Sequence, residues 1–401
     1  MLIRRGLFCI LVLALAYFSV PVYASSKNTN HYLGSYPQPL SKAAVLMDAA
    51  SGRVLYAKNS DVHLPPASLT KIMTGLLVVE NGNLEQATTI SESSAQTPES
   101  TIYLTAGEVL TRRQLLYACL LNSANDAATA LAESVGGDEN KFVKSMNRRA
   151  HELGMKSTHF NNPHGLNTSQ HYTSAYDLAL LTRQAMSNPG FRKVVATKKT
   201  SIPWLGHKND RAIINRNRLL YRYQGAIGVK TGYTKEAGNC VVGAAKRGDL
   251  VLIAVAMNSP RVYEDLIQML DYGFAHYQLT KIKKSTEVSV AVNVLWGETS
   301  TLKANLSDDL AIALTPAEKA QVTYRVFPKK QVFAPVRRGQ ILGVCKTYIN
   351  GCEISQGDLV ASSNVSKKAS PRGRTSSGAI WIVGLGAAIF SLYMFLRPRL
   401  K

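Results

Sequence analysis

Apolar and polar residues alternate with two different periods along the chain, and the change falls near residue 280. Before it, the apolar positions of residues 68–80 recur every three or four residues, which predicts a helix. Thr111 and Gln114 form the capping box of a second helix that runs to Leu121. After residue 280, every second side chain is apolar in three stretches, 288–296, 310–314 and 322–326. This pattern predicts a domain of mixed helices and strands, followed by a small antiparallel β domain.

The first of these domains also contains strand patterns. Residues 42–57 read as a hairpin, and three further strands are predicted at 227–230, 240–245 and 250–257. A helical pattern at 265–276 closes the domain. We therefore expect an α+β domain, an antiparallel sheet with helices, at residues 32–278, and an all-β domain at 281–361. No combination of residues in the β domain suggests catalysis.

The N-terminal segment has the pattern of an export signal. The basic residues 4–5 precede an apolar stretch at 7–20, and Val22 and Ala24 place small side chains at the −3 and −1 positions of a cleavage site. These are the three regions of a secretory signal peptide, which we place at residues 1–24.

The C-terminal segment has the pattern of a membrane anchor. Residues 379–396 run for 18 positions without a charge, about enough to cross a bilayer. Residues 362–377 are rich in Ser, Lys and Arg and read as a flexible basic tether. An interfacial amphipathic helix is the alternative, but the segment is apolar on all sides, which favours spanning. We expect a transmembrane anchor at 378–396 and a mature protein on the extracytoplasmic face of the membrane.

Composition narrows the class of protein further. Of the 401 residues, 46% are hydrophobic and 18% charged, which excludes wholesale disorder. The net charge of +21 suits an anionic cell wall, and no nucleic-acid-binding signature is present. The five cysteines have no zinc-site spacing, and we expect neither a metal nor a cofactor.

The first chemical motif is Ser68-Leu69-Thr70-Lys71 at the start of the predicted helix. Side chains at positions i and i+3 share a helix face, so the Lys71 amine can reach the Ser68 hydroxyl. Serine is a weak nucleophile until a base takes its proton. Lysine, with an ordinary pKa of about 10.4, becomes a useful base when burial or a second cation lowers that pKa. Alone, the motif is common by chance, and a capped helix with a surface lysine is then the more frequent explanation.

Two further motifs follow in the chain. Ser123-Ala124-Asn125 separates two predicted helices, where Ser and Asn also serve as ordinary N-caps. Lys230-Thr231-Gly232 ends a predicted strand, where a turn glycine is equally common. Each motif is weak by itself, but the three in this order on helix, loop and strand are a strong signal.

This set of motifs resembles the penicillin-binding protein and serine β-lactamase superfamily. Longer segments are similar to the low-molecular-mass D-alanyl-D-alanine carboxypeptidases within it, and they are residues 44–56, 66–74, 162–166, 172–178 and 228–234. The dense part of the resemblance covers about residues 40–278. It implies a penicillin-binding, β-lactamase-like transpeptidase domain, and an enzyme that removes the terminal D-alanine from peptidoglycan stem pentapeptides and reacts covalently with β-lactam antibiotics.

The resemblance implies a role for each catalytic residue. Ser68 attacks the carbonyl between the two D-alanines, and Lys71 accepts its proton. Ser123 relays a proton to the leaving amine. Asn125 holds the substrate amide and contacts Lys71. In the 162–166 loop, we expect the His164 side chain to make a structural hydrogen bond rather than to take part in catalysis.

The substrate-binding residues follow from the third motif. Lys230 adds positive potential and Thr231 binds the terminal carboxylate, with Gly232 in the same strand. The backbone N–H groups of Ser68 and Tyr233 form the oxyanion hole. Arg261, which follows the last predicted strand, is a candidate bidentate ligand of the carboxylate.

Three alternatives share the motifs. A class A β-lactamase needs a glutamate to activate water, and no acid between Asn125 and Lys230 lies in an E-x-x-L-N setting. A D-Ala endopeptidase that cuts cross-links, and an inactive wall-binding β-lactam sensor, remain open.

The cysteines give one structural expectation. Asn350-Gly351 is a strong signal for a two-residue hairpin and pairs Ile349 with Cys352. Cys345 then lies about 13 Å up the partner strand, at about 3.3 Å per residue, too far for a disulfide with Cys352. We expect no bond between them, and expect Cys119 and Cys240 to be buried apolar groups.

Overall fold

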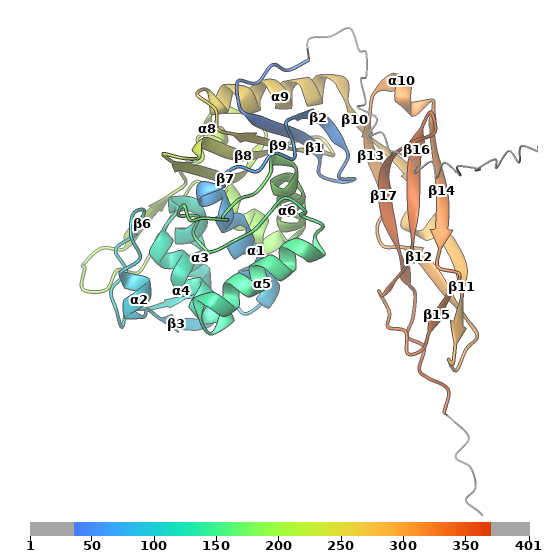
Figure 1. Ribbon diagram of the computed structural model, residues 1–401, viewed down its shortest axis with the longest axis horizontal. Coiled ribbons are helices and arrows are strands. Elements are labelled where there is room, and N and C mark those ends of the chain that lie inside the picture. The colour runs from blue at the N-terminus through green and yellow to red at the C-terminus, as the bar shows by residue number, and fades with distance from the viewer. Residues whose placement is uncertain (1–35, 370–401) are drawn as a thin grey trace, which may run out of the picture. The chain divides into compact units, whose positions relative to one another are not determined.

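The computed structural model describes residues 36–369 of the chain (Figure 1). The predicted signal peptide at 1–24, the predicted anchor at 378–396 and the last part of the predicted tether lie outside the described residues. Within residues 36–369, no helix is long and apolar enough to cross a bilayer.

A five-stranded antiparallel sheet forms the centre of the first domain. Its strands lie in the order β2-β1-β9-β8-β7, and their bounds are β1 Ala43–Asp48, β2 Val54–Lys58, β7 Ala226–Thr234, β8 Gly238–Arg247 and β9 Leu250–Met257. The first strand pairs with a strand more than two hundred positions later, with Val45 opposite Val255. The start of this domain therefore closes on its end, and the residues between them form the helical layer and the site.

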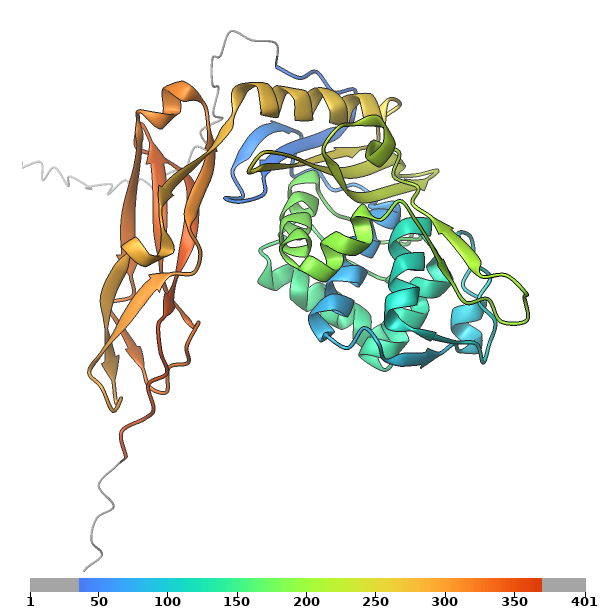
Figure 2. The same ribbon diagram turned by 180° about the vertical axis from the view of Figure 1, so that it is seen from behind.

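Helices cover both faces of this sheet. Helix α9 (Val262–His276) and the short helix α8 (Leu219–Arg222) lie on one face, where a Cβ on Gly243 would meet side chains of both, and the other helices lie on the opposite side (Figures 1 and 2). These are α1 Lys71–Asn81, α2 Glu92–Ala95, α3 Arg112–Tyr117, α4 Asn125–Gly136, α5 Glu139–Glu152, α6 Ala175–Ser187 and α7 Pro189–Ala196. Two short strand pairs, β3 Ala87–Thr89 with β4 Val109–Thr111 and β5 Lys199–Ile202 with β6 Arg211–Ile214, complete the domain.

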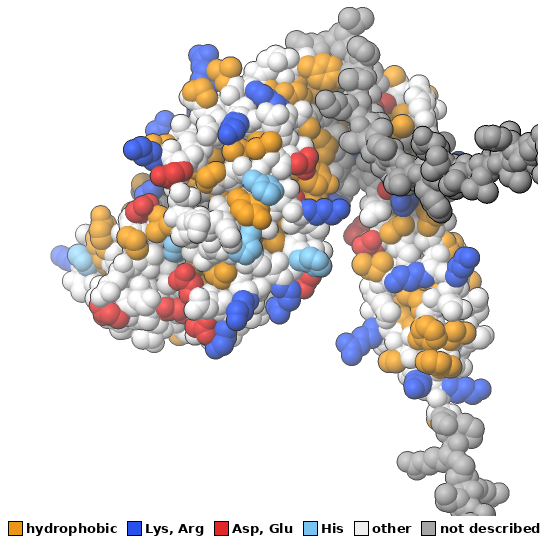
Figure 3. Space-filling model, viewed as in Figure 1, with side chains coloured by type: hydrophobic (Ala, Val, Ile, Leu, Met, Phe, Trp, Pro, Cys, Tyr) orange, Lys and Arg blue, Asp and Glu red, His pale blue; other side chains and the backbone are white. Residues whose placement is uncertain are grey.

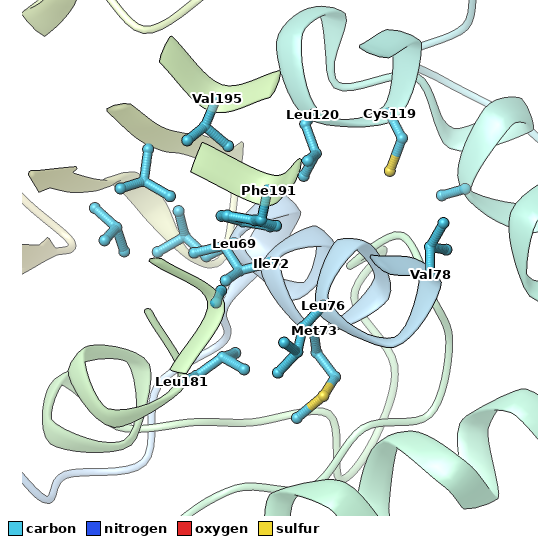
Figure 4. Close-up of a cluster of buried hydrophobic side chains, with 14 of the residues drawn as sticks. Leu69, Ile72, Met73, Leu76, Val78, Cys119, Leu120, Leu181, Phe191 and Val195 are labelled. Atoms are coloured by element: carbon cyan, nitrogen blue, oxygen red, sulfur yellow. The ribbon is translucent and has the colours of Figure 1, made fainter. Parts of the chain in front are cut away.

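The helix that carries the first motif lies in the middle of the apolar core. Leu69, Ile72, Met73 and Leu76 are fully buried. Figure 4 shows side chains from other helices around them. Gly75 makes close packing possible, because an added Cβ would lie 3.0 Å from Phe191 and 3.1 Å from Leu120. A helix buried on all sides cannot shift without disturbing the whole core, so the start of α1 is a rigid platform.

The second domain is the predicted β domain. A six-stranded sheet has the order β14-β16-β17-β12-β11-β15, and β10 pairs with β13. The strands are β10 Gln278–Lys283, β11 Ser289–Leu295, β12 Thr301–Leu306, β13 Leu310–Leu314, β14 Val322–Pro328, β15 Gln331–Phe333, β16 Ile341–Ile349 and β17 Cys352–Ala361, with one short helix, α10 Pro316–Lys319. All pairs except β11 with β15 are antiparallel. The domain has its own apolar core, which includes Val292, Leu342 and Leu359.

The boundaries of the β domain are wider than expected. Strand β10 begins at Gln278 and pairs with β13, which lies within the β domain. The domain therefore begins at Gln278 rather than at 281. Val365 bridges to Val336, and Lys367 bridges to Gly297. Residues 362–368, which the sequence placed in the tether, therefore belong to the β domain.

The hairpin prediction for the cysteines is confirmed. Ile349 lies opposite Cys352, and the turn residues Asn350 and Gly351 have φ angles of 50° and 79°. Cys345 lies opposite Gly357, far from Cys352 in the register. The four described cysteines are free, and all except Cys352 are buried.

Candidate active site

Ser68 lies in a tight turn at the N-terminus of the central helix. A 3₁₀ turn (Ala67–Thr70) leads directly into α1, whose first residue is Lys71. Ala67 has a φ of 48°, an unusual value for a residue with a side chain. The turn leaves Ser68 half-buried, with its Oγ 3.0 Å from Lys71 Nζ. The contact predicted from the i, i+3 spacing is therefore present.

The Lys71 amine is completely buried and has three oxygen neighbours. Besides Ser68 Oγ, its Nζ donates to Asn125 Oδ1 at 2.7 Å and to the His164 carbonyl oxygen at 2.6 Å. Burial lowers the pKa of Lys71 from 10.5 to about 8, and the positive charge of Arg216 adds to this effect. A neutral amine has two N–H groups, which match the two carbonyl acceptors and leave its lone pair facing Ser68 Oγ. The surroundings thus suit a proton acceptor.

Ser123 is held on the opposite side of the site by the second lysine. It follows a π-helical turn (Ala118–Asn122) and has left-handed backbone angles, φ 66° and ψ 26°. Lys230 Nζ donates to Ser123 Oγ at 3.0 Å and to the Thr231 carbonyl oxygen at 2.9 Å. Burial lowers the pKa of Lys230 well below its usual value, and the charge of Lys71 lowers it further.

Asn125 connects the second motif to a neighbouring loop. It is the first residue of α4, and its N–H donates to the Ser100 carbonyl oxygen at 2.6 Å. Its Nδ2 donates to the Pro98 carbonyl oxygen at 2.8 Å, which fixes the amide plane with Oδ1 toward Lys71. Asn125 also lines the cavity described next.

Strand β7 forms one wall of a cavity of 430 Å³ that also contains Ser68 and Ser123. The third motif was expected to end its strand, but β7 continues to Thr234. Thr231, Gly232 and Tyr233 line the cavity, and Tyr233 is 66% exposed. A Cβ on Gly232 would lie 3.1 Å from the Ser68 nitrogen, so a glycine lets the strand approach the nucleophile's turn. This places the backbone of β7 beside the Ser68 N–H, as an oxyanion hole requires.

Two arginines that line the cavity were not predicted from the sequence. Arg216 and Arg218 both line it, in the loop between β6 and α8. Arg216 Nη1 donates to Ser100 Oγ at 3.1 Å, and its charge lowers the pKa of both buried lysines. Asn215 and Asn217 shape the loop, because each accepts from a backbone N–H two positions later. An Asn-x-Asn pair in the sequence indicates an ordered loop, but its spacing does not predict that the loop will line the active-site cavity.

Arg261 lies differently from its two neighbours. It is the exposed N-cap residue of α9, while Val262 and Tyr263 line the cavity. Its own side chain is not part of the cavity wall. The carboxylate-binding role of Arg261 stays a prediction.

The 162–166 loop supports the site through its backbone. His164 accepts from Lys71 with its carbonyl oxygen, while its ring Nδ1 accepts from the Leu166 N–H at 3.3 Å. Burial lowers the pKa of the His164 ring to about 3, so the ring is neutral at physiological pH. Gly165 has a φ of 95°, and an added Cβ would overlap the carbonyl oxygen of Ala67. This loop therefore holds the Lys71 amine and touches the turn that carries Ser68.

The arrangement belongs to a recognised class. A serine hydroxyl faces a buried lysine amine, a second serine faces a second buried lysine, and a strand runs beside the nucleophile. These features define a serine acyl-transfer enzyme with a penicillin-binding type of site. Within residues 36–369, no group of three or more His, Cys, Asp and Glu side chains is arranged to hold a metal ion.

Comparison with known proteins gives the family. Residues 31–261 match the family model described as D-alanyl-D-alanine carboxypeptidase, and residues 277–367 match that of the penicillin-binding protein 5 C-terminal domain. The chain belongs to the D-alanyl-D-alanine carboxypeptidase family, and the resemblance drawn from its motifs is confirmed.

Similar proteins cover one or both domains. The D-alanyl-D-alanine carboxypeptidase DacF of Bacillus subtilis is 34% identical over 338 residues, which is 82% of this chain and 86% of that protein. DacB2 of Mycobacterium tuberculosis is 35% identical over 60% of this chain and 86% of its own length. The crystal structure of penicillin binding protein 5 from Haemophilus influenzae has a TM-score of 0.66 and 28% identity, and covers 83% of this chain and 100% of that one.

Proposed function

We propose that this protein is a serine-type D-alanyl-D-alanine carboxypeptidase that removes the terminal D-alanine from peptidoglycan stem pentapeptides. The observation that carries the proposal is the 3.0 Å contact between Ser68 Oγ and the Nζ of a fully buried lysine with a lowered pKa. The family and the relatives' names supply the substrate class.

In the acylation step, neutral Lys71 takes the proton of the Ser68 hydroxyl as Oγ attacks the carbonyl between the two D-alanines. The negative charge that develops on the carbonyl oxygen is bound by the backbone N–H groups of Ser68 and Tyr233. The C–N bond then breaks, and Ser123 relays the proton held by the Lys71 ammonium to the leaving amine, so that Lys71 is neutral again. Because Lys230 donates to Ser123 Oγ, its charge state controls how readily this hydroxyl gives up its proton.

In the deacylation step, water attacks the acyl carbonyl and Lys71 again accepts the proton. The Ser68 ester bond breaks, the hydroxyl recovers its proton, and a shortened peptide leaves. β-Lactam antibiotics enter the same first step, because their strained amide is opened by Ser68 to give an acyl-enzyme.

The substrate carboxylate belongs at the β7 side of the cavity. Thr231 offers a hydroxyl there, and Lys230 and Arg216 supply positive potential. Arg216 is a better-placed cation than Arg261, since Arg216 lines the cavity and Arg261 does not. Asn125, which lines the cavity, holds the peptide amide.

The location that we propose rests on the sequence patterns of the two terminal segments. We place it on the extracytoplasmic face of the membrane, with the signal peptide removed and residues 378–396 as a transmembrane anchor. The support is the length of the uncharged stretch and the nature of the substrate, which lies outside the cytoplasm. Its partners are then peptidoglycan peptides, β-lactams and the membrane.

The test compares Ser68→Ala with the parent enzyme. We expect the variant to fold, to lose covalent labelling by fluorescent penicillin, and to release no D-alanine from a pentapeptide. Labelling that persists in the folded variant would place the nucleophile elsewhere.

The same assays separate the alternatives. Mass spectrometry of a muropeptide after incubation with the parent enzyme shows loss of one alanine for a carboxypeptidase and a cut cross-link for an endopeptidase. Rapid turnover of benzylpenicillin marks a β-lactamase, and a stable acyl-enzyme without peptide turnover marks a sensor.

A further inference from the structure

One end of the β domain carries exposed aromatic side chains on a fixed backbone. Trp296 is 65% exposed and Phe333 is 52% exposed, and their ring centroids are 4.9 Å apart. Leu295, beside them, is 36% exposed. We call Leu295, Trp296 and Phe333 the aromatic tip. Two large rings in contact with each other at an interplanar angle of 44° and exposed to water form an apolar surface patch.

The backbone under the aromatic tip is held from both sides. The Leu295 carbonyl oxygen accepts from the Ala334 N–H at 2.9 Å, and that of Trp296 accepts from the Lys368 N–H at 2.7 Å. Trp296 has a φ of 59°, which is unfavourable for a bulky residue. A strained backbone that points a tryptophan outward is typical of a surface selected for contact.

The register of the sheet puts basic residues around the aromatic tip. Strands β11, β14, β15 and β17 end, and β12 and β16 begin, at this end of the domain. The basic residues in the segments that meet there are Lys303, Lys329, Lys330, Arg337, Arg338, Lys367 and Lys368, and the one acid among these segments is Glu298. Lys367 Nζ lies 5.8 Å from the centroid of the Trp296 ring. The tip is therefore apolar at its centre and positive around it.

The opposite end of the sheet has a different charge. The acids Glu287, Asp308, Asp309, Glu318 and Glu353 lie in or beside the segments at that end together with Lys281, Lys283, Lys284 and Lys319, so that end is close to neutral. Figure 3 shows the orange side chains of the β domain gathered on one part, with blue Lys and Arg side chains on either side. A charge gradient along a small domain orients it toward an anionic partner.

The chain leaves the β domain at the aromatic tip. Lys367 and Lys368 pair with the Trp296 turn, and ten positions separate Ala369 from the start of the uncharged stretch at 379. At about 3.6 Å per residue, ten residues span at most about 36 Å. If residues 378–396 anchor the protein, as proposed above, the tip stays within that distance of the bilayer.

We propose that the aromatic tip docks on the anionic surface of the membrane, with Trp296 and Phe333 at the headgroup level and the surrounding Lys and Arg side chains against lipid phosphates. Tryptophan is enriched at membrane–water interfaces because its ring is apolar with one polar N–H. Basic side chains beside an anchor are attracted to anionic lipid. The inference rests on the proposed anchor, and it adds a second, reversible contact that orients the β domain on the lipid.

The test uses the full chain and the fluorescence of single tryptophans. The sequence has three, Trp204, Trp296 and Trp381. Trp204→Phe with Trp381→Phe leaves Trp296 alone, and Trp296→Phe with Trp381→Phe leaves Trp204, in the segment between β5 and β6, as the matched control. Both proteins are added to phosphatidylglycerol vesicles and to phosphatidylcholine vesicles that carry a spin label near the headgroup.

We expect the emission of Trp296 to shift to shorter wavelength and to be quenched by the spin label in phosphatidylglycerol vesicles. Both effects should be smaller in phosphatidylcholine vesicles. They should be smallest when Lys367→Gln and Lys368→Gln are added to the Trp296-only protein. Trp204 emission should stay unchanged.

A chain that sediments with vesicles while Trp296 keeps its aqueous emission would overturn the docking but keep the anchor. A chain that does not sediment would overturn both. A concentration-dependent shift without vesicles would instead assign the tip to a second copy of the chain, and quenching of Trp204 would show that the contact is not specific to the tip.

Discussion

The two domains of the protein differ in where their lysine and large aromatic side chains lie. In the first domain, β1 and nearly all of β9 are buried, because helices cover both faces of the sheet. Two lysines are fully buried there, and their pKa values fall. In the β domain, β11 alternates buried and exposed positions, and a tryptophan and a phenylalanine project into solvent.

The difference shows what each environment is suited to. A lysine becomes a base at neutral pH only where water is excluded and its charge is poorly solvated. That condition needs a thick core, which the helical layer and the sheet of the first domain supply together. A sheet whose strands alternate buried and exposed positions, as β11 does, can instead present side chains to a partner. From this comparison we infer that the first domain carries out the catalytic reaction and that the second domain makes contact with a partner surface.

The largest effect should come from removing the buried amine. Lys71→Met keeps a side chain of similar length, but its thioether sulfur is too weakly basic to accept the Ser68 proton. We expect acylation by penicillin and D-alanine release to fall by about 10²–10⁴-fold, the range for loss of a general base. Stopped-flow acylation kinetics measure it. The control is Lys319→Met on the exposed surface of α10, which should leave the rate unchanged. A Lys71→Met rate within a few fold of the parent would exclude Lys71 as the base.

A second prediction compares a glycine from each domain. An added Cβ at Gly165 would overlap the Ala67 carbonyl oxygen beside Ser68, and its φ of 95° disfavours a side chain. Gly165→Ala should therefore displace the nucleophile's turn, cost roughly 1–3 kcal/mol of stability and lose most of the activity. Thermal unfolding and penicillin labelling measure both.

The matched control for this change is Gly357→Ala in β17. There the nearest atom to an added Cβ is Leu306 Cδ2 at 3.5 Å, an ordinary contact. We expect stability within about 0.5 kcal/mol of the parent, as for most substitutions that meet no special feature, and full activity. If both variants behave alike, the close packing of the Gly165 loop on the Ser68 turn has no catalytic importance.

The sequence predicted the local parts of this architecture well. The Ser68 and Lys71 spacing, the Thr111 capping box and the Asn350-Gly351 turn are each decided by residues within a few positions of one another, and the structure contains all three. Such features follow from helix geometry and turn chemistry, which act over short distances along the chain.

Features that depend on distant packing were not predictable. Arg216 reaches the site because the loop after β6 packs there, with its N–H donating to the Leu121 carbonyl oxygen. The carbonyl oxygen of His164 holds Lys71 because α1 and the 162–166 loop meet in the core. Because every residue has a backbone carbonyl, the residue type does not indicate which carbonyl oxygen will accept from Lys71. Strand β10 was missed because its partner, β13, lies some thirty positions later.

The pH dependence of acylation tests the burial of Lys71 directly. Only the neutral amine accepts a proton, and burial lowers its pKa to about 8. Because the neutral form dominates above that pKa, kcat/KM should rise about tenfold per pH unit below it and level off above it. A profile measured from about pH 6 to about pH 10 shows this. A profile that is level across this range would mean that the base has a pKa below it, and so that another group accepts the Ser68 proton.

The smallest effect distinguishes the two candidate arginines. Arg216 lines the cavity and lowers the pKa of Lys71, whereas the side chain of Arg261 is exposed at the start of α9. Arg216→Gln should raise KM for a pentapeptide by roughly 10- to 150-fold, equivalent to about 1.5–3 kcal/mol for a hydrogen bond to a charged group. It should also move the midpoint of the pH profile to higher pH, because one cation fewer repels the Lys71 ammonium.

Arg261→Gln is the comparison for this change, since it removes the same charge within the same domain. If the geometry holds in the complex, KM and the pH midpoint should both stay near those of the parent. A large rise in KM for Arg261→Gln with an unchanged pH midpoint would instead mean that α9 brings this side chain onto the carboxylate when substrate binds. The two kinetic parameters therefore separate a cation that binds substrate from one that also acts on the buried base.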